Sequence, residues 1–157
     1  MIFEGYSTGP DAVAAGTVDG WYRTGDLLSR DANGVLTFHG RLREAIRRRG
    51  ETIAPAEIEA VALQHPEVVE AAAIGVPADD GVEDAILLCV VLCATADLTP
   101  PGLHAFLARG LPRFMVPRFI RMETALPKTA TTRIRRLALR DAGRSGAWDA
   151  RARRARG

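Results

Sequence analysis

Two apolar stretches separated by a short polar turn limit the folds that this chain can adopt. Residues 68–76 read VVEAAAIGV, residues 85–93 read AILLCVVLC, and the turn between them reads ADDGVED. Short runs of Val, Ile, Leu and Ala bounded by turn residues are typical of buried strands. We therefore expect two buried strands over these residues.

Two helices are predicted on either side of these strands. Pro55 suits the first position of a helix that ends before His65-Pro66, and Thr99 can cap a second helix begun by Pro100. Their inward faces are predicted to carry Ile58, Val61 and Ala62 in the first helix and Leu103, Phe106 and Leu107 in the second.

The rest of the chain adds a strand and a last helix. Residues 117–122, PRFIRM, read as a short strand, and Ile134, Leu137 and Ala138 form the apolar stripe of the helix. We expect an α+β domain over residues 43–142, with a short mixed sheet flanked by helices. Residues 143–157 have no apolar pattern and are predicted to be a disordered basic tail.

The first 42 residues do not contain enough apolar pattern to close a core. Residues 27–30 and 35–39 read as strands around DANG, where Asn33-Gly34 suits the left-handed conformations of a hairpin turn. An isolated hairpin is marginally stable in water. We therefore expect residues 1–42 to be the end of a larger domain.

Composition argues against two classes of protein, those that bind nucleic acid and those that span a membrane. The net charge is only +2, so no global field favours nucleic acid or membrane, although Arg is clustered at 41–43, 47–49 and from Arg133 onward. The longest apolar run has ten residues, about half of what a membrane helix needs. No basic region followed by an apolar stretch opens the chain, so we expect a cytoplasmic protein.

Cys89 and Cys93 are predicted to be two buried structural thiols. On one strand their Cα atoms would lie about 13 Å apart, too far for a disulfide. They also lack His, Asp or Glu at metal-ligand spacing, and no metal site is expected.

Residues 21–27, WYRTGDL, place Asp26 on a glycine turn just before a strand. A carboxylate at such a position can accept two hydrogen bonds from the cis-diol of a ribose. Taken alone, the segment is better explained as an ordinary Gly-Asp turn.

Residues 40–59 read GRLREAIRRRGETIAPAEIE and combine a Gly-Arg turn, a basic strand, Gly50 and an acidic helix. A solvated edge strand that carries charges against aggregation would also look like this. The spacing to the preceding motif favours a functional unit instead.

Together these segments resemble the ANL superfamily, which includes acyl-CoA synthetases, adenylation domains of nonribosomal peptide synthetases and luciferases. The resemblance rests on YRTGD at 22–26 and on the motif at 40–59, and it extends from the lead-in FEGYSTGPDAVAAGTVDGW to about residue 142. It implies the carboxy-terminal lid domain of an acyl-CoA synthetase, preceded by a remnant of the amino-terminal domain.

The resemblance implies a two-step reaction. ATP and a carboxylic acid give an acyl-adenylate and pyrophosphate, and CoA then displaces AMP. By resemblance, Asp26 holds the ribose hydroxyls, Arg41 lies near the ribose and phosphate, and Arg43 is the hinge where the family has Lys or Asp. Arg47 and Gly50 would lie on the face that meets the thiol, and Arg47 to Arg49 could attract CoA phosphates.

The form of the motif favours CoA over a carrier protein as the thiol donor, because RRRGETIAPAEIE resembles acyl-CoA synthetases and no carrier domain follows. ATP, with its Mg²⁺, and CoA are implied as substrates rather than as tightly bound cofactors, and fatty acid metabolism is the expected setting. The acyl pocket lies outside these residues in the family.

Residues 126–136, LPKTATTRIRR, depart from the family, whose loop reads Leu-Pro-x-x-x-x-Gly-Lys. The family lysine bridges the substrate carboxylate and the α-phosphate in the transition state. Thr132 and Arg133 stand at the Gly and Lys positions. Arginine keeps the charge but is bulkier and planar, which puts the rate of adenylation in doubt. Lys128 is not expected to replace the lysine, because it lies five residues earlier on a differently directed part of the loop.

The Gly/Ser/Thr-rich loop for the ATP phosphates, which lies in the family's amino-terminal domain, has no match here. We therefore expect a fragment that is inactive alone or that complements a separately encoded amino-terminal half. Two alternatives are an Arg-rich nucleic-acid-binding module around Arg133, Arg135, Arg136 and Arg140, and a regulatory protein that docks on an intact synthetase. The absence of interleaved aromatic residues speaks against nucleic acid.

Overall fold

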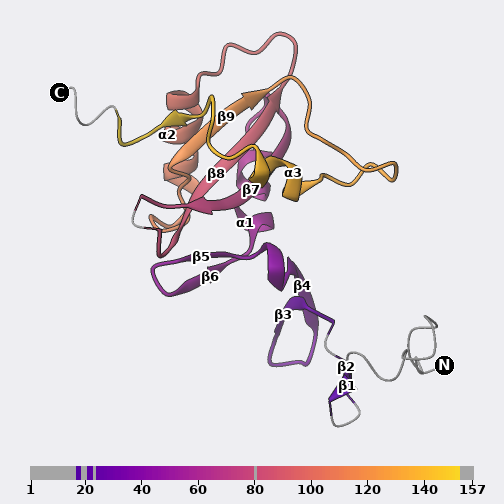
Figure 1. Ribbon diagram of the computed structural model, residues 1–157. Coiled ribbons are helices and arrows are strands. Elements are labelled where there is room, and N and C mark those ends of the chain that lie inside the picture. The colour runs from indigo at the N-terminus through magenta and orange to yellow at the C-terminus, as the bar shows by residue number, and fades with distance from the viewer. Residues whose placement is uncertain (1–16, 19–20, 23, 80, 153–157) are drawn as a thin grey trace, which may run out of the picture.

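A computed structural model describes residues 17–18, 21–22, 24–79 and 81–152 of this chain. Arg23 and most of the lead-in motif predicted near the N-terminus lie outside the described residues. The centre of the molecule is a four-stranded mixed sheet of order β10-β9-β8-β7 (Figure 1). Its strands are β7 (Val68–Pro77), β8 (Asp84–Leu92), β9 (Phe119–Glu123) and β10 (Trp148–Asp149). The predicted α+β class and mixed sheet are confirmed.

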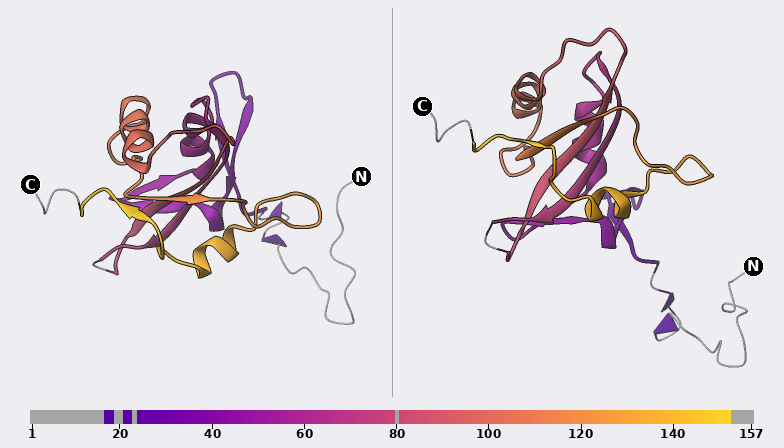
Figure 2. Two further views of the ribbon diagram at one scale, coloured as in Figure 1. Left: turned by 90° about the horizontal axis from the view of Figure 1, so that it is seen from above. Right: turned by 45° about the horizontal axis from the view of Figure 1, so that its top comes forward.

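The two predicted buried strands pair with each other in antiparallel register, and both of their faces are covered. Ile86, Leu88 and Val90 point into one apolar cluster, whereas Leu87 and Cys89 point into the other. Figure 2 shows the sheet nearly edge-on, with α1 and α2 on one side and α3 on the other. Burial on both faces explains why these strands are continuously apolar rather than alternating.

Helices α1 (Pro55–Ala62) and α2 (Pro100–Gly110) begin where the sequence predicts. The Thr99 hydroxyl accepts a hydrogen bond from the backbone N–H of Gly102 at 3.3 Å, which confirms the predicted cap. Leu103 and Leu107 are fully buried, and Phe106 packs on the same cluster while half-buried. None of the described helices is long and apolar enough to cross a membrane.

Three hairpins precede this body. Strands β1 (Thr17–Val18) and β2 (Trp21–Tyr22) form the first, and β3 (Asp26–Arg30) and β4 (Leu36–Arg41) form the predicted second one. In its turn only Gly34 is left-handed, with a φ of 84°, whereas Asn33 is not. The turn therefore spans residues 31–35 and is closed by the N–H of Asp31, which donates to the carbonyl of Val35 at 3.0 Å.

The third hairpin was not predicted. After the short 3-10 helix η1 (Leu42–Glu44), strands β5 (Ile46–Arg48) and β6 (Glu51–Ile53) pair antiparallel where the sequence suggested a single basic strand. Ile46 and Ile53 are buried in the cluster that α1 and α2 cover. One face of this basic segment is therefore part of the core.

The apolar stripe predicted for the last helix is partly wrong. Helix α3 (Arg136–Asp141) buries Leu139, whereas Leu137 is 70% exposed. Ile134 precedes the helix and packs against the same cluster as Leu139. Leu137 lies two positions before Leu139, about 200° around the helix axis, so it faces away from the sheet when Leu139 is buried.

The two cysteines have different surroundings, so the prediction of two buried thiols holds for one of them. Cys89 is fully buried in β8, and burial raises the pKa of its thiol to about 11. Cys93 lies just after the strand, half-buried, with its Sγ 3.7 Å from the hydroxyl of Thr95. Both are free thiols.

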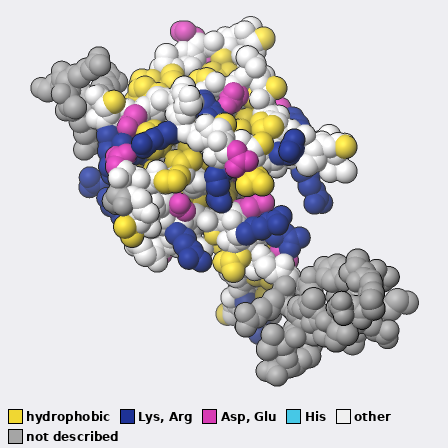
Figure 3. Space-filling view, in the orientation of Figure 1, with side chains coloured by type: hydrophobic (Ala, Val, Ile, Leu, Met, Phe, Trp, Pro, Cys, Tyr) yellow, Lys and Arg dark blue, Asp and Glu magenta, His cyan; other side chains and the backbone are white. Residues whose placement is uncertain are grey.

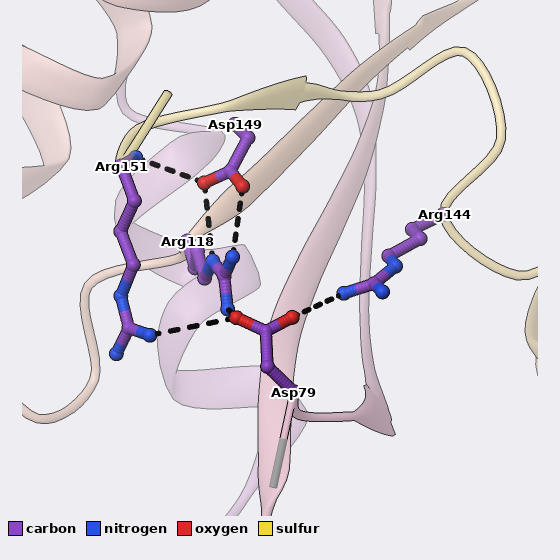
Figure 4. A network of polar contacts seen from close by, with 5 residues as sticks. All are labelled: Asp79, Arg118, Arg144, Asp149 and Arg151. Atoms are coloured by element: carbon purple, nitrogen blue, oxygen red, sulfur yellow. Dashed lines mark hydrogen bonds and ion pairs between the residues drawn. The ribbon is translucent and has the colours of Figure 1, made fainter. Parts of the chain in front are cut away.

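The prediction of a disordered tail is wrong for the described residues 143–152. Strand β10 pairs with β9, and the Asp149 carboxylate accepts hydrogen bonds from Nε and Nη2 of Arg118 at 3.1 and 2.9 Å. Figure 4 shows Asp79 on the other side of Arg118, where it also faces Arg144 and Arg151. These contacts link residues more than thirty positions apart, so local sequence pattern does not reveal them.

The ion pair between Arg118 and Asp149 should stabilise the tail in a pH-dependent way. Hydrogen bonds from Arg118 lower the pKa of the Asp149 carboxyl. Stability from such a carboxylate is complete above its ordinary pKa of about 3.9 and is lost as the pH falls through the lower value. We expect Asp149→Asn to lower the free energy of unfolding by about 1 kcal/mol at pH 7, with a smaller difference from wild type below pH 4.

Urea denaturation at pH 7 and pH 3 measures this difference. Asp141→Asn is the matched control, because Asp141 is exposed and forms no ion pair within the described residues. A pH-independent difference between wild type and Asp149→Asn would contradict the assignment.

Candidate functional site

Asp26 and Arg41 face each other across the β3–β4 hairpin. They are paired residues in the strand register, and Nη1 of Arg41 lies 2.7 Å from Oδ1 of Asp26. The same Nη1 donates to the carbonyl of Thr24 at 2.9 Å. The other carboxylate oxygen, Oδ2, has no hydrogen bond within the described part of the chain. Arg41 therefore forms an ion pair with Oδ1 of Asp26, and this oxygen is buried and accepts no hydrogen bond from a described residue.

Arg43 lies in the 3-10 helix η1, between this hairpin and the body of the domain. Its side chain is exposed and forms no hydrogen bond or ion pair with another described residue. A hollow of about 580 Å³ brings Arg43 together with Thr24, Gly25, Arg41, Leu42 and Arg47. Three of the predicted site residues, Arg41, Arg43 and Arg47, thus line one space beside Asp26.

The β5–β6 hairpin presents Arg47 and Gly50. Its two turn residues, Arg49 and Gly50, are both left-handed, with φ of 55° and 76°. A two-residue turn of this kind favours glycine at the second position. A Cβ on Gly50 would meet nothing within 4 Å, so the backbone conformation, rather than crowding inside the chain, accounts for this glycine.

Two carboxylates at the start of β8, which the sequence analysis did not single out, hold this hairpin. The backbone N–H of Arg47 donates to Oδ2 of Asp84 at 3.1 Å, and that of Arg49 donates to Oε1 of Glu83 at 2.9 Å. The Asp84 side chain lies over Gly75, where an added Cβ would be 2.7 Å from Oδ2. The acidic end of the polar turn ADDGVED was the only signal for these contacts.

A second hollow, of about 540 Å³, is strongly basic. Its charged lining residues are Arg48, Arg49, Arg113, Arg118 and Arg151, with His104 beside them. Burial, followed by the charges of Arg49 and Arg151, lowers the pKa of Arg48. Arg49 and Arg113 have no ion pair through their side chains in the described residues. The hollow therefore offers uncompensated positive charge to an anion.

The loop between β9 and α3, which carries Arg133, is a short hairpin. The N–H of Thr129 donates to the carbonyl of Arg133 at 2.8 Å, and the N–H of Thr132 donates to the carbonyl of Thr129 at 3.0 Å. The turn at residues 31–35 has the same two bonds, with Gly34 at the equivalent position. Thr132 is left-handed, with a φ of 64°. A β-branched residue is strained in this region.

Arg133 itself is exposed and lies apart from the first group of residues. Figure 1 shows its loop projecting from the sheet, whereas β3 and β4 lie below the body of the domain. In Figure 3, Lys and Arg side chains gather where the compact body narrows toward the β3–β4 hairpin. The fold therefore brings Asp26, Arg41, Arg43 and Arg47 together but not Arg133.

Two basic residues near this loop, Lys128 and Arg136, form ion pairs with carboxylates of the domain body. Nζ of Lys128 is 2.8 Å from Oε1 of Glu70, and Lys128 is bridged to Ile134 across the loop. Arg136, one of four arginines in the nucleic-acid alternative, is turned to Glu59. Among the described residues no group of three or more His, Cys, Asp and Glu is placed to hold a metal ion.

Comparison with known proteins finds a family model and relatives that match this chain. Residues 57–133 match the family model of the AMP-binding enzyme C-terminal domain. The chain is 41% identical over 139 residues to the sulfoacetate–CoA ligase of Cupriavidus necator, covering 88% of this chain and 27% of that protein. It is 38% identical over 135 residues to the oxalate–CoA ligase of Arabidopsis thaliana, covering 86% and 26%.

A solved structure agrees with these relatives. The ATP-bound crystal structure of MatB from Rhodopseudomonas palustris has a TM-score of 0.79 and 28% identity, over 90% of this chain and 28% of that one. The chain thus spans about a quarter of the length of the proteins it matches. None of these comparisons supports the nucleic-acid alternative.

The strain at Thr132 predicts a stabilising substitution. We expect Thr132→Gly to raise the free energy of unfolding by about 0.5–1 kcal/mol, because release of left-handed strain exceeds the added entropy of the unfolded chain. Guanidinium denaturation measures this change. Ala130→Gly in the same turn is the control, because Ala130 has no positive φ and should be slightly destabilised. Equal destabilisation by both substitutions would contradict strain at Thr132.

Proposed function

Because this chain contains the AMP-binding enzyme C-terminal domain and is similar to CoA ligases over most of its length, we propose that it is the carboxy-terminal part of an ATP-dependent acyl-CoA synthetase. The intact enzyme joins a carboxylic acid to CoA and releases AMP and pyrophosphate. The observation that carries the proposal is the shared hollow of Arg41, Arg43 and Arg47 beside Asp26, where the two parts of the chain meet.

In the first step these residues bind the nucleotide. Oδ2 of Asp26 accepts a hydrogen bond from a ribose hydroxyl, while Arg41 holds Oδ1 and adds positive charge near the α-phosphate. ATP arrives with Mg²⁺. Arg133 supplies the positive charge that the family's lysine supplies in the transition state. The rate of adenylation is lower, because a planar guanidinium replaces an ammonium group.

The domain then turns about η1 so that the β5–β6 hairpin meets CoA. Arg43 suits a hinge because its side chain is exposed and is not held by other described residues. At the hairpin tip, Gly50 has open space around it, which lets the pantetheine arm pass along the backbone. The basic hollow next to this tip binds the CoA phosphates through Arg48, Arg49 and Arg113.

The remaining parts of the site are supplied by an amino-terminal domain, either in one chain with these residues or separately encoded. The β3–β4 hairpin supports this, because Leu28, Leu36 and Phe38 expose 47%, 62% and 61% of their surface. Such a patch is typical of a surface that another part of the protein covers. The cytoplasm, where ATP and CoA are available, stays the predicted compartment.

The 157 residues alone should not activate an acid. We expect purified chain to show no acid-dependent exchange of pyrophosphate into ATP, because its sequence has no match to the phosphate-binding loop and the loop between β9 and α3 projects away from the β3–β4 hairpin (Figure 1). An intact CoA ligase assayed in parallel is the positive control. Robust exchange by the purified chain would contradict the proposal.

The basic hollow should distinguish CoA from dephospho-CoA. We expect the chain to bind CoA more tightly than dephospho-CoA. Arg49→Ala or Arg113→Ala should weaken CoA binding about tenfold and reduce the difference in affinity between the two ligands. Isothermal titration calorimetry measures both ligands. Arg135→Ala is the control, since Arg135 is exposed near the other face of the sheet and outside the hollow. Equal affinity of the wild-type chain for both ligands would rule out a phosphate site here.

A further inference from the structure

The loop that carries Arg133 is fixed to the domain on both of its legs. On the first leg, Nζ of Lys128 donates to Oε1 of Glu70 on β7 at 2.8 Å. On the second leg, Nη2 of Arg136 donates to both carboxylate oxygens of Glu59 at 2.6 and 2.8 Å. Both anchors are opposite-charge contacts, and they add to an apolar base formed by Leu126 and Ile134 on the second cluster.

The second anchor is the more rigid one. Glu59 lies on α1 with its side chain only 13% exposed, and its Oε1 also accepts a hydrogen bond from the backbone N–H of Ala73 at 2.8 Å. The Glu59 carboxylate therefore links α1 to β7 and also accepts the hydrogen bonds of Arg136. A hydrogen bond to a charged and partly buried group is stronger than one at the surface.

Arg136 also faces the hinge helix. Its Nε lies 3.8 Å from Oε2 of Glu44 in η1, beyond hydrogen-bond distance. This Nε is buried and has no hydrogen-bond partner. An unsatisfied buried donor is uncommon and needs a physical reason. A hollow of about 330 Å³, lined by Glu44 and Arg136 together with Arg43, leaves room for Glu44 to approach.

We propose that Arg136 is a positioning residue that couples the hinge helix η1 to the loop carrying Arg133. A shift of η1 by about 1 Å toward α3 brings Glu44 within hydrogen-bond distance of Nε. The guanidinium then bridges Glu59 and Glu44, so that the orientation of the hinge sets how firmly the loop is held. The inference deepens the proposed function, because it names the contact by which hinge rotation reaches the adenylation loop.

The guanidinium shape is essential to this coupling. Nη2 serves Glu59 and Nε points to Glu44 from the same planar group. A lysine could neutralise Glu59 but has a single nitrogen and cannot bridge both carboxylates. Neighbouring Arg135 and Arg140 are exposed and have no ion pair in the described residues, so they cannot replace Arg136.

The test is amide hydrogen exchange by NMR on the 157-residue chain. Glu44→Gln removes the charge on the hinge without changing the pair between Arg136 and Glu59. We expect exchange at the amides of Thr132 and Arg133 to accelerate about two- to fivefold, the range that partly exposed ion pairs give. Glu57→Gln, on the exposed face of α1, is the matched control and should leave these amides unchanged.

A second variant separates coupling from simple charge neutralisation. Arg136→Lys should accelerate exchange both at Thr132 and at Ala45, whose N–H closes η1 onto the carbonyl of Leu42. Exchange rates at Thr132 and Ala45 that stay at the wild-type value in Arg136→Lys would mean that positive charge alone is sufficient, and they would overturn the proposal. Amides of Ile86 and Leu88 in the core report whether the fold persists.

If Arg136→Lys fails to fold, the result with Glu44→Gln decides the question. Unchanged exchange at Thr132 and Arg133 in the folded Glu44→Gln variant would overturn the coupling. These readings need neither ATP nor an acid, so they hold or fail independently of whether the chain supports adenylation. A coupled loop, together with failure of these residues to support thioester formation when joined to the amino-terminal part of a related CoA ligase, would instead contradict the proposed function.

Discussion

Burial of β7 and β8 on both faces is the constraint on which the rest of the structure depends. Because most side chains of the central strands point into an apolar cluster, both faces of the sheet need a cover. Helices α1 and α2, with the β5–β6 hairpin, cover one face, and Leu126 and Leu139 close the other. The basic hairpin and the loop of Arg133 are therefore attached at opposite faces of one rigid sheet.

Carboxylates of the domain body then fix these two basic segments. Glu83 and Asp84 accept backbone N–H groups of the hairpin, whereas Glu59 and Glu70 accept the side chains at the base of the loop. This arrangement explains how Arg can be clustered while the chain has a net charge of only +2. Arg43, Arg49, Arg113 and Arg133 remain outside these pairs. They are among the arginines to which we assign roles toward the substrates or the hinge.

Sequence pattern predicted the elements whose signals are local. The strands at 68–76 and 85–93, the start of α1 at Pro55 and the Thr99 cap of α2 depend on neighbouring residues, and the structure confirms them. The β5–β6 hairpin was missed because RRRG looks like solvated charge, and its support comes from Glu83 and Asp84 more than thirty residues away. The tail was missed for the same reason, since Asp149 depends on Arg118. The site residues were found only through resemblance to a family, because one exposed Asp or Arg has no distinctive local pattern.

The central claim is that this domain supports thioester formation fully but adenylation poorly, because Arg133 replaces a lysine. The direct test joins residues 24–152, which include strand β10 and Asp149, to the amino-terminal part of a related CoA ligase and measures the two half-reactions separately. We predict near-normal thioester formation from preformed acyl-adenylate, adenylation reduced about a hundredfold, and recovery of most of that loss by Arg133→Lys. Adenylation at the relative's own rate with Arg133 present, or no recovery with lysine, would contradict this account.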